Sequence, residues 1–332
     1  MNHLQGETVP AITVVSVFHN REGFVERSLQ SLAKQTFGDI QYLIYNDGST
    51  DNTLEELRKF EDYDKFTIID QENIGFTNTL VKAFAQVRSK YIAIHASGDI
   101  SLPERFEKQF QYMEGSPNCG LVGSKVRYWH NGRNSVGKID AARLTGSRLY
   151  TAASPIDHCT FFLRNKGYRE IGGYRKFFRF TQDFDLFLRM RRLYSVSVIN
   201  EVLVNCNSYA MIEGVRTNPR KRILQKYYAD FAIQCDASYC ESGIDLLDEW
   251  GVDGPFFRRQ SSFLAKRFIM SGVSLMRKGD LENACLNFSL AMKEGRFITR
   301  LVLKPILWCL GWHCRRHDAK SNLKVKDSMP IL

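Results

Sequence analysis

The chain has 332 residues, 44% of them apolar and 25% charged, which is typical of a soluble globular protein with more than one core. Its 46 Lys and Arg exceed its 36 Asp and Glu, and the resulting net charge of +10 favours an anionic partner such as a nucleotide. No stretch reaches the ~18 apolar residues of a membrane span. The eight Cys show neither CxxC nor metal-site spacing, which indicates free thiols in a reducing compartment.

The first hundred residues alternate between predicted strands and helices. Residues 11–17 form a β-branched run, and residues 21–35 repeat apolar side chains at helical spacing. The alternation continues with strand 40–46, helix 49–60, strand 65–70, helix 75–89 and strand 90–96. Short alternation of this kind implies crossover connections, so we predict an α/β fold with a mostly parallel, mixed sheet and helices on both faces.

The pattern changes from Cys119 onward. Residues 119–129, 131–139 and 195–210 indicate antiparallel strands, and residues 180–194 a helix. The first predicted strand is not followed by GxGxxG, which excludes a dehydrogenase-type dinucleotide fold.

Polar loops follow four of the predicted strands. Asp47 comes directly after the second strand, in the stretch NDGSTD. Taken alone, this stretch is most simply a tight turn with a helix cap. Ligands of parallel α/β sheets, however, lie beyond the carboxyl ends of the strands, where these loops meet. Together the four loops therefore favour a ligand site.

Five stretches, in this order and spacing, resemble the family 2 glycosyltransferases of the GT-A fold. They are VVSVFHNREGFVERSLQSLAKQTF, IYNDGSTDNT, ENIGF, YIAIHASGDISLPERFEKQ and GGYRKFFRFTQDFDLFLRM. The resemblance covers residues 9–209. It implies an enzyme that moves a hexose or N-acetylhexosamine from a nucleotide sugar, usually a UDP-sugar, to an acceptor hydroxyl with inversion.

The resemblance also implies residues that bind the nucleotide sugar. A carboxylate at the position of Asp47 accepts hydrogen bonds from the base or ribose, and an aromatic ring such as Phe18 flanks the base. A glycine such as Gly75 lets the backbone approach the ligand. The expected binding residues are Ser16, Val17, Phe18, Asp47, Asn73, Gly75, Asp99 and His158. For His158 a structural role and a pocket role stay equally open.

The loop after the fourth strand departs from the family pattern. The family places two acids in a DxD motif that holds Mg²⁺ or Mn²⁺, and the corresponding positions here are Ala96 and Gly98 around Ser97. Asp99 is the remaining acid. A divalent cation bound through Asp99 and phosphate oxygens is one alternative, at even odds. The other is that basic side chains neutralise the diphosphate, for which the candidates are Arg175, Lys176 and Arg179.

The resemblance identifies Asp183 as the catalytic base that removes the proton of the acceptor hydroxyl. It stands in TQDFDLFLRM, where Gln182 replaces the glutamate of the family. Without the resemblance, Asp183 and Asp185 would be first-turn acids favoured by the helix dipole.

The last hundred residues are predicted to be helical. We expect a glycosyltransferase domain over 9–215 and a helical domain over 216–332. Residues 268–295 are spaced like one tetratricopeptide-type hairpin, with generic packing favoured over a partner role. The basic, Trp-containing segment 296–317 either docks on the core or contacts a membrane surface, and we favour the second.

Three classes of function remain open. The first is a glycosyltransferase of cell-surface polysaccharide synthesis, cytoplasmic and peripheral on the inner face of the plasma membrane, with a glycan or lipid-linked acceptor. The second is a catalytically weak or inactive GT-A module that binds nucleotide or glycan and recruits a partner. The third, nucleic-acid binding, ranks last because the sequence carries no such motif, and we expect no nucleic-acid partner.

Overall fold

The computed structural model describes residues 9–130, 133–137, 154–207 and 218–295, together with Thr299 and residues 303–305. It contains two compact units, residues 1–252 and 253–332. Helix α8 (Pro219–Ser242) falls in the first unit. The boundary between the compact units therefore lies further along the chain than the predicted domain boundary at 215/216. Where the glycosyltransferase domain itself ends stays a prediction.

The described part of the first unit is built on one nine-stranded sheet, in the order β3-β2-β1-β4-β8-β6-β9-β5, with β7 paired to β6. The strands are β1 (Ile12–Phe18), β2 (Ile40–Asp47), β3 (Phe66–Gln71), β4 (Tyr91–Ile94), β5 (Ile100–Ser101), β6 (Cys119–His130), β7 (Arg133–Val136), β8 (Phe162–Arg164) and β9 (Ser195–Asn207).

The first four strands are parallel, as the sequence predicts, with β1 between β2 and β4. In the second half, β8 pairs antiparallel with both β4 and β6, and β7 pairs antiparallel with β6. The prediction of antiparallel strands holds for β9 on one side only, because β9 pairs antiparallel with β5 but runs parallel to β6. A helical crossover makes this possible, because helix α7 (Gln182–Leu193) directly precedes β9.

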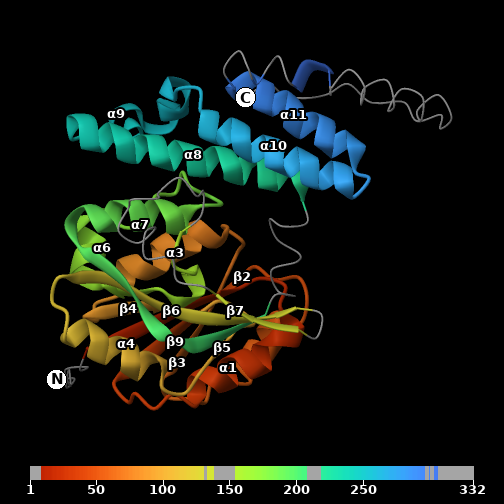
Figure 1. Ribbon diagram of the computed structural model, residues 1–332. Coiled ribbons are helices and arrows are strands. Elements are labelled where there is room, and N and C mark those ends of the chain that lie inside the picture. Colours follow the sequence, from red (N-terminus) through yellow and green to blue (C-terminus); the bar gives the residue numbers. More distant parts are fainter. Residues whose placement is uncertain are drawn as a thin grey trace. The chain divides into compact units, whose positions relative to one another are not determined.

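Helices cover both faces of the sheet, which confirms the predicted α/β class (Figure 1). On one face lie α1 (Val25–Ala33) and α4 (Arg105–Glu114), and on the other α3 (Phe76–Gln86), α6 (Asn165–Glu170) and α7. The helix α2 (Thr53–Arg58) follows β2, and α9 (Leu246–Trp250) follows α8. All seven residues of β1 are buried, since a strand covered on both faces needs apolar side chains on both. The carboxyl ends of β1 to β4 therefore meet at one edge of a rigid sheet.

The second unit contains a helix hairpin, α10 (Ser262–Arg277) and α11 (Leu281–Glu294), preceded by the 3₁₀ turn η3 (Gly251–Phe257). A Cβ on Gly272 would come within 2.7 Å of the Phe288 ring, so the glycine allows the two helices to pack closely. The predicted hairpin is present, and whether it binds a partner is untested. No helix among the described residues has the length and apolar character needed to cross a membrane. Most of the segment 296–317 lies outside the described residues.

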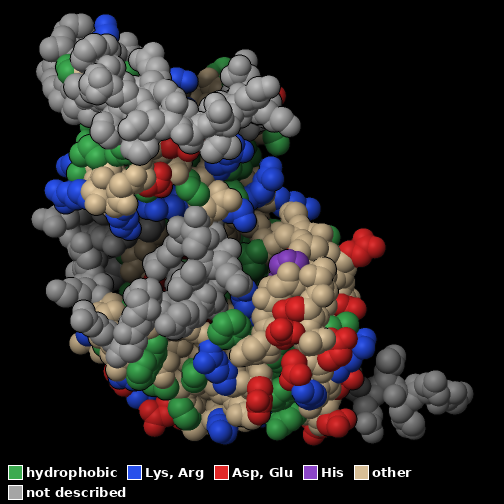
Figure 2. Space-filling view, turned by 90° about the vertical axis from the view of Figure 1, so that its right-hand side faces the viewer, with side chains coloured by type: hydrophobic (Ala, Val, Ile, Leu, Met, Phe, Trp, Pro, Cys, Tyr) green, Lys and Arg blue, Asp and Glu red, His purple; other side chains and the backbone are tan. Residues whose placement is uncertain are grey.

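The excess positive charge does not form one continuous surface on the face drawn in Figure 2. Asp and Glu side chains gather in one area of this face, and Lys and Arg side chains gather in others.

Candidate active site

A cavity of about 230 Å³ lies beyond the carboxyl end of β4. Three of its lining residues, Ala96, Ser97 and Asp99, come from the loop that replaces the DxD motif. The others are Arg21, Tyr128, Asp157, His158, Cys159, Cys206 and Asn207. A second cavity, of about 240 Å³, lies near the start of β2 and β3 and is therefore at the opposite end of these strands. The first cavity is the candidate active site.

The loop between β4 and β5 is held by buried polar contacts. The Ser28 hydroxyl donates to Asp99 O (3.0 Å) and accepts from Gly98 N (3.2 Å). His95 bridges Ser28 and Ser101 through its two ring nitrogens, at 2.8 and 3.0 Å, and burial lowers its pKa to about 3, so the ring is neutral. Arg105 donates to Ile94 O (2.7 Å) from beneath. These contacts fix the loop, so the cavity is preformed on this side.

Asp99 lies at the floor of the cavity and is 3% exposed. Its Oδ1 accepts from Asn207 N at 3.0 Å, whereas its buried Oδ2 has no hydrogen-bond partner among the described residues. Burial raises the pKa of Asp99 to about 6, although the Asn207 N–H and the neighbouring thiols of Cys206 and Cys159 oppose the rise. The Oδ2 atom is therefore a buried acceptor beside the cavity.

His158 contacts Tyr174, a residue within electrostatic range of the predicted base Asp183. It lies in the 3₁₀ turn η2 (His158–Thr160), and its Nε2 is 2.7 Å from the Tyr174 hydroxyl. Burial lowers the pKa of His158 to about 4, so the imidazole is neutral. The ring also makes edge-to-face contacts with Phe76 and Phe161. His158 thus both lines the cavity and holds its wall together, which fits the two roles left open by the sequence.

Asp183 stands in the first turn of α7, after the N-cap residue Thr181. Burial raises the pKa of Asp183 to about 6, backbone N–H groups at the helix start oppose the rise, and the charge of Asp157 adds to it. Because Asp157 lines the cavity, this interaction brings Asp183 within electrostatic range of the site. A carboxylate with a pKa near neutrality suits a general base.

Asp47 has a fully occupied carboxylate. Its Oδ1 accepts from Gln71 Nε2, Ile74 N and Thr79 Oγ1, and its Oδ2 accepts from Gly75 N, all at 2.9 to 3.1 Å. The side chain is 2% exposed. Asp47 therefore holds the loop of Asn73 and Gly75 at the carboxyl end of β2, so the structure brings these three predicted residues together.

The three residues predicted from the first strand are buried rather than exposed to a ligand. Ser16 is 1% exposed, Val17 7% and Phe18 0%, and the Phe18 ring belongs to the main hydrophobic core. The expectation that this ring flanks a base therefore does not fit the structure, because its faces are covered by core side chains. His19, the next residue, contacts Asp47 O through Nδ1 at 2.9 Å and lies beside Asn73.

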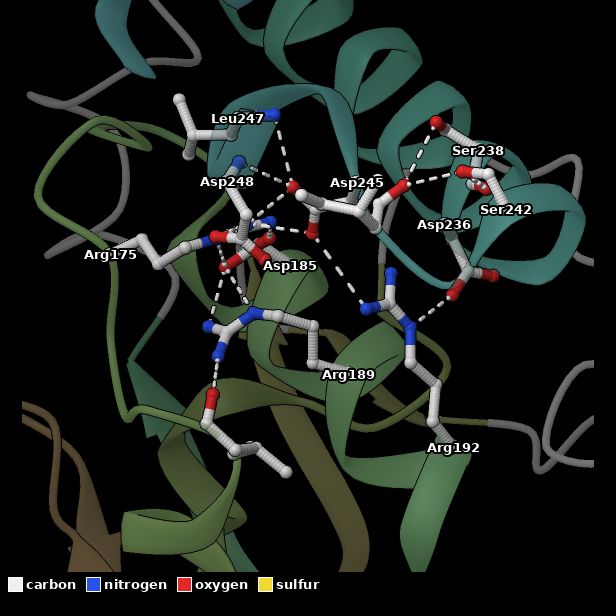
Figure 3. A network of polar contacts seen from close by, with 12 residues as sticks. Arg175, Asp185, Arg189, Arg192, Asp236, Ser238, Ser242, Asp245, Leu247 and Asp248 are labelled. Atoms are coloured by element: carbon white, nitrogen blue, oxygen red, sulfur yellow. Dashed lines mark hydrogen bonds and ion pairs between the residues drawn. The ribbon is translucent and has the colours of Figure 1, made fainter. Parts of the chain in front are cut away.

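A network of buried ion pairs connects α7 to the segment around α9 (Figure 3). The Arg175 guanidinium lies between Asp185 and Asp245, and its Nη1 donates to both oxygens of Asp245 at 2.9 and 2.8 Å. Arg189 donates to Asp185 Oδ2 at 2.7 Å, and Arg192 Nε donates to Asp236 of α8 at 2.9 Å. Asp245 is fully buried and also caps α9. The network therefore fixes the first turn of α7 against residues 236–248.

This network corrects two expectations. Arg175 is paired with two buried carboxylates, so it is not available to neutralise a diphosphate. Asp185 is not an incidental first-turn acid, because burial alone would raise its pKa, yet Arg189 and Arg175 outweigh burial and hold the pKa below its ordinary value.

Sequence reasoning missed six residues that line the cavity. Two have a signal in the chain, since Asp157 adjoins His158 and Arg21 directly follows the first-strand loop. The other four, Tyr128, Cys159, Cys206 and Asn207, lie on or beside late strands and carry no motif. Tyr128 donates to Asp157 Oδ1 at 2.6 Å, which links β6 to the η2 turn. Pairings between distant strands brought these four side chains to the site.

Comparison with known proteins agrees with this fold. Residues 13–172 match the family model described as glycosyl transferase family 2. An uncharacterized glycosyltransferase of Haemophilus influenzae is 26% identical over 339 residues, which cover 96% of each chain.

Three solved structures, of two proteins, share the fold. TarS of S. aureus superposes on 90% of this chain with a TM-score of 0.58 at 16% identity, and this chain spans 52% of TarS. TarS 1–349 in complex with UDP-GlcNAc gives a TM-score of 0.53 at 14% identity over 85% of this chain and 92% of that one. The mannosyltransferase PcManGT of Pyrobaculum calidifontis was solved with GDP-Man and Mn²⁺. It superposes with a TM-score of 0.55 at 14% identity, over 89% of this chain and 79% of that one.

The mixed sheet with its rim of polar loops is thus a GT-A-like fold that also contains a helical C-terminal region. The chain carries a glycosyltransferase family 2 domain, matched over residues 13–172, and is a glycosyltransferase.

The residues at the DxD position do not fit a metal held as the family motif holds it. Ala96 and Gly98 offer no ligand side chain, and Asp99 already accepts a hydrogen bond through one of its two oxygens. In the part of the chain that the structure describes, no three His, Cys, Asp or Glu side chains are grouped so that they could bind a metal ion. Hard divalent cations require several oxygen ligands, and this loop supplies one carboxylate.

Proposed function

We propose that the protein is an inverting glycosyltransferase that moves a sugar from a UDP-sugar to a hydroxyl group of a glycan or lipid-linked acceptor. The main support is the position and raised pKa of Asp183, which lies at the start of α7 within range of the cavity. The complexes of related folds with UDP-GlcNAc and GDP-Man support a nucleotide sugar as the donor.

In the proposed reaction, the ionised Asp183 accepts the proton of the acceptor hydroxyl while the oxygen attacks the anomeric carbon. The nucleoside diphosphate leaves from the opposite face, which inverts the anomeric configuration. Asp99 Oδ2 accepts a hydrogen bond from a sugar hydroxyl, since it is buried at the floor of the cavity and has no described partner. Neutral His158 orients the sugar from the wall.

The nucleotide is proposed to bind at the rim formed by His19, Asn73 and Gly75. Asp47 acts there mainly by holding the loop, because its oxygens accept four hydrogen bonds from protein groups.

We further propose a place in cell-surface polysaccharide synthesis, on the inner face of the plasma membrane. The basic segment 296–317 with its two Trp residues supports contact with an acidic membrane surface.

The test is a thermal-shift screen with UDP-Glc, UDP-GlcNAc, UDP-Gal and GDP-Man, followed by measurement of nucleotide release. A donor that binds the native state raises the melting temperature. Release of UDP from that donor, lost in Asp183→Asn, supports the proposal. Binding of a donor with no release in the presence of acceptor extracts would instead support an inactive nucleotide-binding module.

A further inference from the structure

The donor of the proposed reaction carries a diphosphate, and its leaving group gains negative charge as the sugar bond breaks. Such charge is normally met by a cation or by directed hydrogen-bond donors. The loop that would hold a metal ion offers a single carboxylate. A positively charged side chain near this loop is therefore needed in place of the metal ion.

Two arginines near the site are committed elsewhere. Arg175 is paired with Asp185 and Asp245 (Figure 3). Arg105 is fully buried beneath the loop, where it donates to Ile94 O and Ser101 Oγ. Neither can reach a diphosphate without breaking buried contacts, which costs several kcal/mol.

A third arginine, Arg21, contacts the cavity directly. It lines the cavity together with Ala96, Ser97 and Asp99, and among the described residues that line this cavity it is the one Lys or Arg. The same wall carries two acids, Asp99 and Asp157, and acids at positions 96 and 98 would add two more negative charges around the guanidinium. Ala and Gly at those positions therefore leave Arg21 with less competition for an anionic ligand.

The backbone that carries Arg21 is fixed by the turn after β2. Asn20 has a left-handed φ of 51°, its N–H donates to Ser49 Oγ (3.0 Å), and its Oδ1 accepts from Thr50 N (2.8 Å). Arg21 N donates to Thr53 Oγ1 at 2.7 Å, and Arg21 Nη1 donates to Asn20 O at 3.0 Å. A non-glycine residue with positive φ is kept only where its surroundings determine it. The NDGSTD stretch, which contains Asp47, thus also orients the segment that carries Arg21.

We infer that Arg21 binds the diphosphate of the donor, so that donor binding by this enzyme does not require a divalent metal ion. The inference rests on the proposed function, because it presumes a nucleoside diphosphate ligand. A guanidinium suits this role, since its planar fork can donate two hydrogen bonds to phosphate oxygens and keeps its charge at any physiological pH.

The experiment is isothermal titration calorimetry of UDP and of uridine, each in EDTA and in Mn²⁺. We expect the wild-type protein to bind UDP with similar affinity in both buffers. Arg21→Ala should weaken UDP binding by roughly 10- to 100-fold, the usual effect of losing a charge-assisted hydrogen bond. Its affinity for uridine, which lacks the phosphates, should stay at the wild-type value and so report an intact fold. Arg21→Lys should retain part of the UDP affinity.

The matched control is Arg27→Ala. Arg27 is an exposed arginine of α1 that lies over the Phe24 ring, so this variant removes the same charge away from the cavity. It should bind UDP as the wild type does.

Two outcomes would overturn the inference while leaving the proposed function intact. One is UDP binding that depends on Mn²⁺ in the wild type. The other is an Arg21→Ala variant that binds UDP normally or loses uridine and UDP affinity equally. If the wild type binds none of UDP, GDP, CDP and ADP, the proposed function itself is wrong and the inference falls with it.

Discussion

Asp183 and Asp185 are two residues apart on the first turn of α7, and their environments differ sharply. Burial raises the pKa of Asp183 to about 6, and no arginine offsets it. Asp185 is buried too, yet Arg189 and Arg175 hold its pKa below the ordinary value. Side chains two residues apart on a helix point in different directions, which is why the two acids have different surroundings.

The comparison separates two uses of a buried carboxylate. In the network, every charge has a partner of opposite sign, which favours a single rigid arrangement of α7, α8 and the residues before α9. Asp99 at the cavity and Asp183 near it have raised pKa values instead, because burial outweighs the neighbouring groups that favour their charged forms. The ion-paired acids of the network hold helix α7 in place, and the two acids with raised pKa values, Asp99 and Asp183, are the candidates for chemistry.

The largest effect is expected from Asp183→Asn. The amide preserves the shape of the side chain but cannot accept a proton, so transfer should fall by roughly 10²- to 10⁴-fold. Donor affinity should change little, because a base acts in the transition state. The measurements are UDP release and calorimetric donor binding. Glu55→Gln, an exposed acid in the first turn of α2, is the control. Near-normal turnover of Asp183→Asn would place the base elsewhere.

Asp185→Asn should chiefly lower stability. It leaves two arginines without their shared partner, and breaking a buried ion pair costs about 3–5 kcal/mol of the free energy of unfolding. The depressed pKa means that this stabilisation is present above the unfolded pKa of about 3.8 and is lost as pH falls through the folded value. Urea unfolding at pH 7 and at low pH measures both effects.

The control for Asp185→Asn is Asp248→Asn. Asp248 contacts the same Arg175 at 3.4 Å, but its side chain is 56% exposed, so its loss should cost less than about 1 kcal/mol. Equal losses from the two variants would contradict the distinction between buried and exposed members of the network.

The pH dependence of activity should follow Asp183. A general base must be ionised, so kcat/KM should rise about tenfold per pH unit up to about 6 and then level off. Because burial raises the pKa of Asp99 to about 6 as well, the profile should be repeated with Asp99→Asn. The rising limb should persist in that variant, and its disappearance would assign the titration to Asp99.

The smallest effect concerns the charge-poor loop. Gly98 has φ 93°, where an aspartate would be strained, so Ala96→Asp is the better way to restore an acid. The new carboxylate should lower UDP affinity about tenfold in EDTA through repulsion of the diphosphate, and Mn²⁺ should recover it. Ala96→Asn, similar in size and uncharged, is the control. Unchanged affinity in EDTA would mean that position 96 does not face the diphosphate.

Much of the first half of the fold could be predicted because its signals are local. The apolar runs of β1, β2 and β4 and the helical spacing between them require a covered parallel sheet, and the structure contains it. The pairing of β9 with β6 could not be predicted, because period-two patterns do not specify whether a strand runs parallel or antiparallel.

The sequence by itself determined the sheet, the polar loops at one edge and the acid at the start of α7. Only the tertiary structure decided which of these charges are paired. Arg175 and Asp245 are 70 residues apart. Arg21 and Asp157, which are far apart in the chain, line one cavity. Spacing along the chain carries no information about such contacts. The availability of a charge depends on burial and on its partners, and both arise only when the chain has folded.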